Sequence, residues 1–238
     1  MDFIQALKKR QAAGCMPVIA DIKRRSPKEG ELLSGRNPAD VAKALVAAGA
    51  PALSVVTEEK SFGGSADMLR SICKSVNVPI LRKDFIRSED EIAATVDMGA
   101  SAVLLIVAML EEETLRRLYE KALSCGLTPL VETHSAKEIA WANTLGAALI
   151  GINNRDILAL EKDRGEVSTT ESLIKLVRGD AFIISESGIA APEDVMRAGR
   201  AGANAVLVGT ALLTAKDITQ RYKDLSIPAL RGTGANEG

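Results

Sequence analysis

Eight short runs of apolar residues, separated by segments with helical periodicity, most limit what this chain of 238 residues can fold into. Each run is continuously apolar rather than alternating, which is typical of parallel strands buried on both faces. Eight strands that alternate with helices predict an α/β fold, a single (β/α)8 TIM barrel spanning residues 1–238 with a short segment before the first strand. The runs are Val18 to Ala20, Leu53 to Val56, Pro79 to Leu81, Val103 to Ile106, Pro129 to Val131, Leu149 to Ile152, Phe182 to Ile184 and Val206 to Val208.

The intervening segments are amphipathic, and several carry acidic residues early and a glycine just past the end, as helices do. The alternative fold is a doubly wound open sheet, which would call for a G-x-G-x-x-G fingerprint after the first strand. The sequence there is Lys23-Arg24-Arg25-Ser26-Pro27 instead, which favours the barrel. The predicted helices are Pro38 to Ala48, Glu89 to Met98, Glu111 to Ser124, Ala136 to Thr144, Thr169 to Val177 and Pro192 to Ala198.

The charge balance and the rare residues exclude several classes of function. Thirty basic and thirty-one acidic side chains give a net charge of −1, which argues against nucleic acid or an anionic membrane as the main partner. The longest apolar run, Ala102 to Leu110, is about half of the roughly 20 residues that a membrane-spanning helix needs. With three widely spaced cysteines, a single histidine and no secretory signal at the N-terminus, we expect a cytoplasmic protein without a metal site.

Polar residues follow most of the apolar runs, at the strand ends where barrels of this kind carry their active sites. The set combines cations with carboxylates, the arrangement that tunes a lysine or a carboxylate for acid–base chemistry. A ring of structural salt bridges is the alternative interpretation. His134 lies where the fifth helix should begin, and we expect it to serve a turn or a cap. The strand-end residues are Asp21, Lys23, Arg82, Lys83, Asp84, Glu132, His134, Asn153, Asn154, Arg155, Ser185, Glu186 and Ser187.

The last two loops each place a glycine beside a hydroxyl residue, as Ser187-Gly188 and Gly209-Thr210. Backbone N–H groups at such positions favour an anion, and the loops after the seventh and eighth strands of a barrel often bind phosphate. We therefore predict a phosphate site here, with Arg25 and Ser26 of the first loop as candidate additional donors. The alternative is that these glycines only permit tight turns.

Six segments, in order along the chain, resemble the signature segments of the indole-3-glycerol phosphate synthase family. They cover the predicted strand ends, and the resemblance extends from about Asp2 to Thr214. The segments are Val18 to Pro27, Ser54 to Glu58 with Phe62 to Ser65, Leu81 to Ile86, Leu130 to Glu132, Ile150 to Asp156 and Ser185 to Ile189.

The resemblance implies closure of the indole ring of 1-(2-carboxyphenylamino)-1-deoxyribulose 5-phosphate, with loss of CO2 and water, in tryptophan biosynthesis and without metal or organic cofactor. It implies that Lys83 is the general acid, that Glu132 is its acid–base partner, and that Lys23 assists condensation or dehydration. The residues that it implies for the substrate are Asn153 and Arg155 for the carboxylate, Phe62 and Phe85 for the ring, and Ser187, Gly188, Gly209 and Thr210 for the phosphate, with Glu186 also in the binding set.

Two features depart from the family's usual pattern. Members usually carry Glu where Asp21 stands, so we expect Asp21→Glu to change activity and to raise it. The alternative is that the loops have adapted to the shorter acid, in which case Glu overfills the site and lowers activity. Members usually also have a longer N-terminal extension with a helix over the mouth of the barrel, whereas twenty residues precede Asp21 here. Two other functions stay open, namely a Schiff-base lyase acting through Lys83 or Lys23 and a phosphate-sugar binding protein without turnover. Protein partners stay open as well.

Overall fold

The computed structural model, which describes residues 2–155 and 165–229, contains a closed barrel of eight parallel strands. Each strand pairs with the next one along the chain, and β10 pairs with β1 to close the ring, with Val18 opposite Val206. All eight predicted runs fall on these strands, with Pro79 one residue before the start of β5, so the predicted fold is confirmed. The barrel strands are β1 (Val18–Ile22), β4 (Leu53–Val56), β5 (Ile80–Lys83), β6 (Ala102–Ile106), β7 (Thr128–Thr133), β8 (Leu149–Asn153), β9 (Phe182–Glu186) and β10 (Ala205–Val208).

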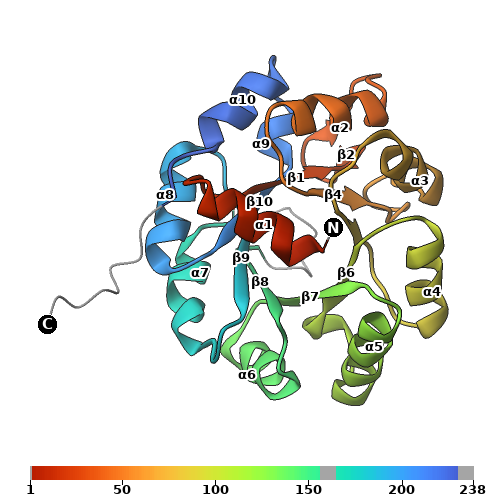
Figure 1. Cartoon of the computed structure of the whole chain (residues 1–238), viewed down its shortest axis with the longest axis vertical. Helices are drawn as coiled ribbons and strands as arrows, with labels where there is room; N and C mark the ends of the chain where they lie inside the picture. The colour runs from red at the N-terminus through yellow and green to blue at the C-terminus, as the bar shows by residue number, and fades with distance from the viewer. Residues whose placement is uncertain (1, 156–164, 230–238) are drawn as a thin grey trace, which may run out of the picture.

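Helices surround the barrel on the outside, as Figure 1 shows. All six predicted helices are present, although the predicted helix Thr169 to Val177 is an α-helix only to Leu173 and continues as a 3-10 turn. The structure adds further helices and a two-stranded hairpin of β2 (Arg25–Ser26) and β3 (Gly30–Glu31) after the first strand. In the described part of the chain, no helix is long and apolar enough to cross a membrane. The helices are α1 (Phe3–Ala12), α2 (Pro38–Ala47), α3 (Ala66–Ser75), α4 (Glu89–Asp97), α5 (Glu112–Ser124), α6 (Ala136–Leu145), α7 (Ser168–Leu173), α8 (Pro192–Ala201), α9 (Thr210–Leu213) and α10 (Ile218–Leu225), with short 3-10 turns η1 (Val107–Met109) and η3 (Ile174–Leu176).

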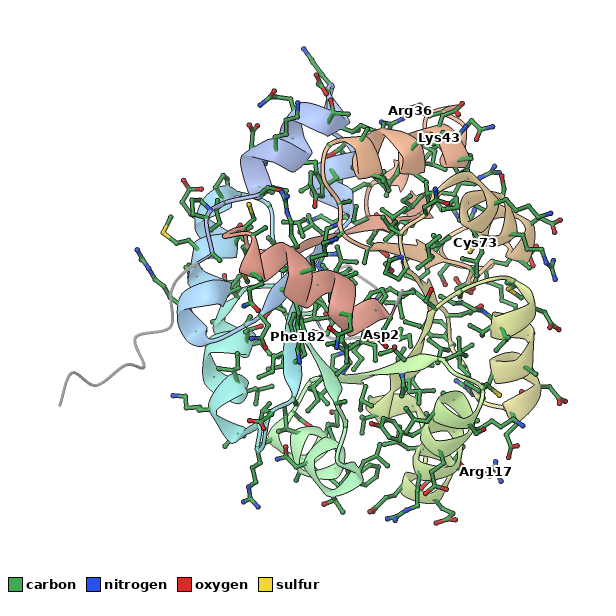
Figure 2. The ribbon with its side chains drawn as sticks, viewed as in Figure 1. Asp2, Arg36, Lys43, Cys73, Arg117 and Phe182 are labelled. Atoms are coloured by element: carbon green, nitrogen blue, oxygen red, sulfur yellow. The ribbon has the colours of Figure 1, made fainter. Side chains whose placement is uncertain are left out.

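The first helix, α1, closes one end of the barrel. It lies across the ring of strands in Figure 1, and Figure 2 shows Asp2 and Phe182 at this end. Phe3 and Leu7 are fully buried and pack in one cluster with side chains from the amino-terminal halves of the strands, among them Phe182. The helix of this N-terminal segment therefore covers the end opposite to the strand ends that carry the polar residues.

Side chains alternate along each strand between the barrel interior and the surrounding helices, as the pleat requires. The interior cluster includes Ile19, Leu81, Leu130, Ile184 and Leu207, each from a different strand. A residue two positions further on must point into the same interior, closer to the carboxyl end of its strand. This rule decides which of the predicted polar residues reach the mouth of the barrel.

Candidate active site

Charged residues continue the interior columns of the strands and meet at the carboxyl end of the barrel. Lys83 follows Leu81 by two positions, Glu132 follows Leu130, and Glu186 follows Ile184. These residues come from three different strands, β5, β7 and β9. The alternation of the pleat, combined with barrel closure, therefore brings together residues that are more than 40 positions apart in sequence.

Lys83 lies between two buried carboxylates and bonds to both. Its Nζ donates to Glu132 Oε2 at 2.9 Å and to Glu186 Oε2 at 2.8 Å. Both glutamates have no exposed side-chain surface, whereas the lysine side chain keeps 19% exposure toward the mouth. A cation that bridges two carboxylates at these distances makes charge-assisted hydrogen bonds, which hold all three groups in fixed positions.

Gly151 makes room for this arrangement. A Cβ at this position would lie 2.0 Å from Glu186 Oε1, much closer than any real contact. The side chain of Glu186 can cross the face of β8 only because residue 151 has no side chain. The glycine in the middle of a buried strand thus marks a close approach rather than a turn.

The three groups shift one another's pKa values in different directions. Burial raises the pKa of Glu186 to about 7, because Glu132 nearby adds to the effect of desolvation and Lys83 offsets only part of it. Burial acts on Glu132 in the same sense, but Lys83 and His134 outweigh it and hold its pKa well below the ordinary value. Burial would lower the pKa of Lys83, yet Glu132, Glu186 and Asp21 together raise it well above its ordinary value. At neutral pH Lys83 is an ammonium and Glu132 a carboxylate.

Asp21 and Lys23 reach the site from the first strand. Both are buried, at 4% and 2% exposure, and Asp21 Oδ1 accepts a hydrogen bond of 2.7 Å from Ser54 Oγ on β4. The Nζ of Lys23 lies 5.8 Å from the centre of the Phe62 ring. The backbone of Gly209 passes so close that a Cβ there would lie 2.9 Å from Asp21 Oδ2. The shorter acid therefore fills its place between β4 and the loop after β10.

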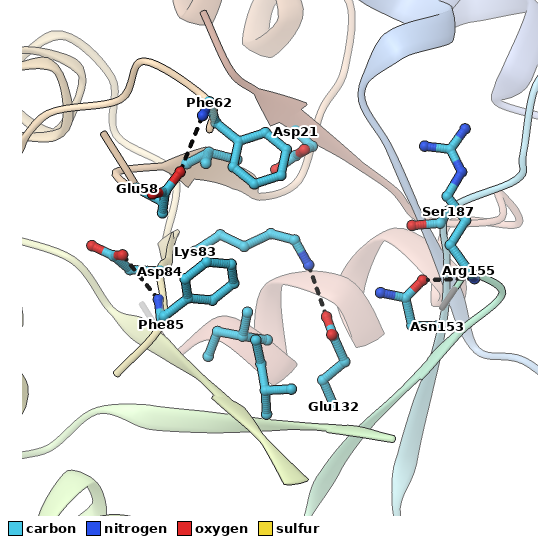
Figure 3. Close-up of a pocket in the computed structure, with 13 residues that line it drawn as sticks. Asp21, Glu58, Phe62, Lys83, Asp84, Phe85, Glu132, Asn153, Arg155 and Ser187 are labelled. Atoms are coloured by element: carbon cyan, nitrogen blue, oxygen red, sulfur yellow. Dashed lines mark hydrogen bonds and ion pairs between the residues drawn. The ribbon is translucent and has the colours of Figure 1, made fainter. Parts of the chain in front are cut away.

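An apolar wall faces these charges within one pocket, shown in Figure 3. Phe62, Phe85, Leu104 and Ile106 line it together with Lys83 and the other charged residues. The two predicted aromatic residues are thus at the mouth, and the apolar end of β6 contributes two residues that the sequence analysis left unassigned.

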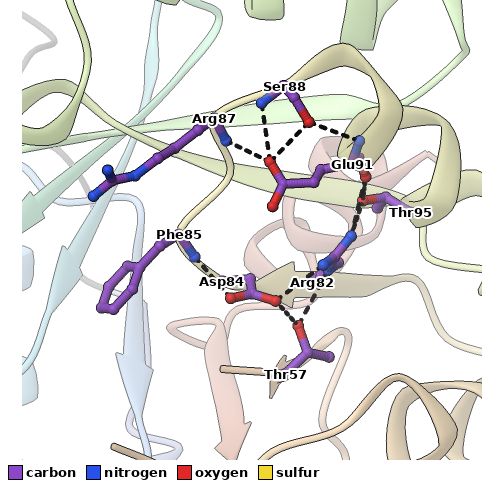
Figure 4. A network of polar contacts seen from close by, with 8 residues as sticks. All are labelled: Thr57, Arg82, Asp84, Phe85, Arg87, Ser88, Glu91 and Thr95. Carbon is purple, nitrogen blue, oxygen red and sulfur yellow. Dashed lines mark hydrogen bonds and ion pairs between the residues drawn. The ribbon is translucent and has the colours of Figure 1, made fainter. Parts of the chain in front are cut away.

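Two carboxylates hold the loops that present the aromatic rings. Glu58 Oε2 accepts from the backbone N–H of Phe62 at 3.1 Å and from that of Ser61 at 2.7 Å. Asp84 Oδ1 accepts from the N–H of Phe85 at 2.9 Å, and its other oxygen is 2.9 Å from Arg82, as Figure 4 shows. Neither carboxylate was in the predicted binding set, although both lie inside the recognised segments.

The end of β8 adds a polar corner to the same pocket. Asn153 and Arg155 both line it, and the side-chain oxygen of Asn153 accepts from the backbone N–H of Arg155 at 3.0 Å. Asp156, the last residue of the recognised segment here, lies outside the described residues.

A second, more polar pocket adjoins the first. Ser187, Gly188, Gly209 and Thr210 line it, as the predicted phosphate site requires, and Lys23 contributes a cation. Ser187 has a φ of +65°, a conformation that non-glycine residues rarely adopt and that concentrates at functional sites. Four residues line both pockets: Asp21, Lys83, Arg155 and Ser187.

Two predicted binding residues do not join the others. Arg25 is exposed, and its guanidinium bonds to the carbonyl groups of Glu59, Lys60 and Ser61 outside both pockets. Ser26 is buried, and its Oγ accepts from the N–H of Glu29 at 3.0 Å. Both residues shape the loops around the mouth instead.

Arg82 and Asn154 also point away from the interior. Arg82 bonds to Thr57 and Thr95 between the barrel and α4, and Asn154 bonds to Thr170 and Ser185 on the outer side of β9. His134 was expected to serve a turn or a cap, but its ring contacts Glu132 as well as Glu138 of its own helix. Within residues 2–155 and 165–229, no three His, Cys, Asp or Glu side chains are grouped so that they could hold a metal ion.

Comparison with known proteins identifies close relatives. The family model described as indole-3-glycerol phosphate synthase matches residues 1–225. Proteins of that name from Thermococcus kodakarensis and Pyrococcus furiosus are 48% and 46% identical, over 84% and 87% of this chain and 87% and 90% of their own. One from a Nocardioides species is 47% identical over 85% of this chain and 76% of its own. A thiamine phosphate pyrophosphorylase from Pyrococcus furiosus superposes with a TM-score of 0.65 at 13% identity, covering 91% of this chain and 95% of its own, which supports the fold.

Proposed function

The chain belongs to the indole-3-glycerol phosphate synthase family, a carboxy-lyase of tryptophan biosynthesis, and we propose on that premise how its residues carry out the reaction. The substrate is a phosphorylated, anthranilate-derived ketose, 1-(2-carboxyphenylamino)-1-deoxyribulose 5-phosphate. The observation that carries the proposal is the pair of adjoining pockets, one aromatic and one polar, that share Lys83. A substrate with an aromatic ring at one end and a phosphate at the other fits such a pair.

The phosphate occupies the polar pocket. The loops at Ser187-Gly188 and Gly209-Thr210 offer backbone N–H groups and hydroxyls, and the buried ammonium of Lys23 adds a positive charge. A Cβ at Gly188 would meet the backbone of Gly165, and one at Gly209 would meet Asp21, so both glycines let these loops pack closely around the pocket. Arg25 takes no part in this contact. Its backbone N–H donates to the carbonyl of Phe62 at 3.1 Å, so it holds the loop that carries one aromatic ring.

The anthranilate ring lies against the apolar wall of the first pocket, between the side chains of Phe62 and Phe85 and the ends of β6. Its carboxylate faces Asn153 and Arg155, whose amide and guanidinium groups donate hydrogen bonds to an anion of this shape. Holding ring and phosphate at fixed points bends the flexible ketose chain between them. The carbonyl carbon is thereby brought to the ring carbon that it must join, which is how enzymes convert binding into proximity.

Lys83 acts on the ketone oxygen. As the ring carbon attacks the carbonyl carbon, negative charge develops on that oxygen, and the ammonium stabilises it and supplies a proton. CO2 then leaves from the ring carbon that attacked, which restores the aromatic ring. The new hydroxyl takes a proton from the acid–base set and leaves as water, while the neighbouring CH2 carbon loses a proton to the same set. The raised pKa of Lys83 supports this role and weakens the lyase alternative, because a Schiff base needs a neutral amine.

Glu132 and the first strand complete the acid–base set. Glu132 is a buried carboxylate at 2.9 Å from Lys83, so it exchanges protons with the substrate and with the lysine as the indole ring forms. Lys23 assists condensation or dehydration from the phosphate side. Asp21 holds the charge balance between the two lysines, and Glu186 fixes Lys83 from the other side.

We further propose that residues 1–238 form one barrel domain and that the protein acts in the cytoplasm, where free thiols persist. All three cysteines are free, which agrees with a reducing compartment.

The decisive test is turnover of the anthranilate substrate, followed by indole absorbance and fluorescence. We expect conversion to indole-3-glycerol phosphate and no covalent adduct on reduction with borohydride. An adduct on Lys83 or Lys23 would instead establish the lyase. Tight calorimetric binding of the substrate without any product would establish a binding protein.

A further inference from the structure

His134 occupies a position between two carboxylates beside the candidate catalytic cluster. Its Nε2 is 3.4 Å from Glu132 Oε1, and its Nδ1 is 3.1 Å from Glu138 Oε2 on α6. The ring is 13% exposed, Glu132 is fully buried, and Glu138 is 16% exposed. Lys83, the next charged group, contacts the other oxygen of Glu132, and Glu186 lies beyond it. His134 itself lines neither pocket.

The position of the ring between two carboxylates favours its charged form. A neutral imidazole has one N–H and one lone pair, so one of its nitrogens would face a carboxylate oxygen without a proton between them. The imidazolium donates to Glu138 through Nδ1, and its Nε2 forms an ion pair with Glu132 Oε1 at 3.4 Å, although neither atom of that pair has a hydrogen-bond partner among the described residues. Burial would lower the pKa of His134, but its contacts with Glu132 and Glu138 and their charges raise it to about 9, so the ring is charged at neutral pH.

Glu138 is fixed by the start of its own helix and cannot turn away from the ring. Its Oε2 accepts from the backbone N–H of His134 at 2.9 Å, and its Oε1 accepts from Ser135 Oγ at 2.7 Å. The residue therefore caps α6 and holds the imidazolium with the same carboxylate. The backbone N–H of His134 thus takes part in capping α6, as predicted, while its ring makes a contact with Glu132 that the capping role does not explain.

The two carboxylates beside Lys83 differ mainly in this contact. Glu132 and Glu186 are both fully buried and lie 2.9 and 2.8 Å from the same ammonium. Glu132 has a second cation, His134, against its other oxygen, whereas the other oxygen of Glu186 lies over Gly151. Two buried carboxylates that share one cation favour a state in which one of them holds a proton.

We propose that His134, held in place by Glu138, is a positioning residue that keeps Glu132 ionised beside Lys83 and leaves the shared proton on Glu186. The inference rests on the proposed role of Glu132. Without the imidazolium, Glu132 loses one of its two cations while it stays buried, so its pKa rises and the proton redistributes between the two glutamates. Protonated Glu132 cannot accept a proton from substrate, and the rate falls at low pH.

The pH profile of kcat in the His134→Asn variant tests the role of His134. The backbone N–H of residue 134 can still donate to Glu138 in this variant, so the helix start is kept. We expect kcat to begin falling at a pH about one unit or more higher than in the wild type. KM should stay within about threefold, since the ring touches neither pocket. Glu138→Gln, which removes the charge that holds the ring, should shift the profile in the same direction by a smaller amount.

Glu91→Gln is the matched control. Glu91 holds the start of α4 as Glu138 holds that of α6, accepting from Ser88 N–H at 2.9 Å, but it has no histidine or buried carboxylate beside it (Figure 4). This variant should keep the wild-type pH profile. A thermal melt of each variant tests whether it is folded at the pH of the assay, and His134→Gln replaces His134→Asn if the latter is not.

The possible outcomes distinguish a failure of the role of His134 from a failure of the proposed role of Glu132. If kcat of His134→Asn falls at the same pH as that of the wild type, the role of His134 is overturned, even if kcat is lower at every pH. An equal pH shift in Glu91→Gln also overturns it, because the shift would then come from the loss of a helix cap and not from the imidazolium. If Glu132→Gln retains wild-type turnover, the proposed role of Glu132 fails instead, independently of His134.

Discussion

At both ends of this barrel, alternate residues of the strands point inward, but these residues are apolar at one end and charged at the other. At the amino-terminal end, α1 closes the interior with Phe3 and Leu7, which pack on apolar side chains of the strands. At the carboxyl end, the same columns continue into Lys83, Glu132, Glu186 and Asp21. Burial of apolar surface stabilises the fold at one end, whereas buried charges at the other end cost free energy and are held for their chemistry. Stability and activity should therefore be separable by position.

The largest effect should come from removing the cation at the polar end. Lys83→Met removes the group that stabilises the developing oxyanion, and we expect kcat to fall by on the order of a thousandfold or more. Substrate affinity should stay within about tenfold, because the phosphate and carboxylate contacts remain. Steady-state kinetics and calorimetry measure the two quantities. Near-normal turnover would mean that Lys83 is not the general acid.

The opposite end should respond in stability alone. Phe3→Ala removes a fully buried ring and should lower the free energy of unfolding by about 3–5 kcal/mol, as measured by urea denaturation. We expect kcat/KM to stay within about twofold at a temperature where the variant is folded. Lys8→Ala, an exposed position of the same helix, should change stability by less than about 0.5 kcal/mol. A fall in kcat of the folded Phe3→Ala protein would show that the two ends are coupled.

The cost of the buried charges should appear in the pH dependence of stability. The pKa of Glu186 is raised from 4.5 to about 7, so the folded protein binds more protons than the unfolded chain between these values. The free energy of unfolding should therefore fall through this window as pH rises. Glu186→Gln does not titrate at this position, and its stability relative to the wild type should rise by about 3 kcal/mol from pH 4.5 to pH 7.5. Parallel curves for the two proteins would contradict the assignment.

The smallest of these effects concerns Asp21. The contacts favour the alternative that a longer acid overfills the site, because Asp21 already bonds to Ser54 and leaves no room for a side chain at Gly209. An added methylene moves the carboxylate away from its bond to Ser54 and toward the pocket, so we expect Asp21→Glu to lower kcat/KM by about tenfold. Asp21→Asn keeps the size and isolates the effect of charge. A faster Asp21→Glu enzyme would show that the first strand adapts freely.

Strand positions and the residues at strand ends could be predicted from the sequence because both depend on local pattern. Which end residues enter the site depends on the phase of the pleat. Lys83 and Asn153 point inward, while Arg82 and Asn154, one position away, point to the helices. Applying the period of two from the interior residue Leu81 would have separated Lys83 from Arg82.

Other features depend on contacts between distant parts of the chain and carry no local signal. Gly151 reads as an ordinary strand residue until Glu186 is placed across it. The ring of His134 reads as part of a helix start, and its contact with Glu132 follows from the geometry of the strand end. No helix was predicted before the first strand, so α1 and the end of the barrel that it covers were missed as well.

The pairing of β10 with β1 sets the order of events during synthesis. Val18 and Val206, which are opposite each other, are about 190 residues apart, and Met16 N–H donates to the carbonyl of Ile227. At about 5–20 residues per second, a ribosome takes roughly 10–40 s to deliver the partner of the first strand. During that interval the nascent β1 has an unpaired edge and exposes an apolar surface, both of which invite aggregation. Ring closure is thus a step that the growing chain can complete only after β10 has been synthesised.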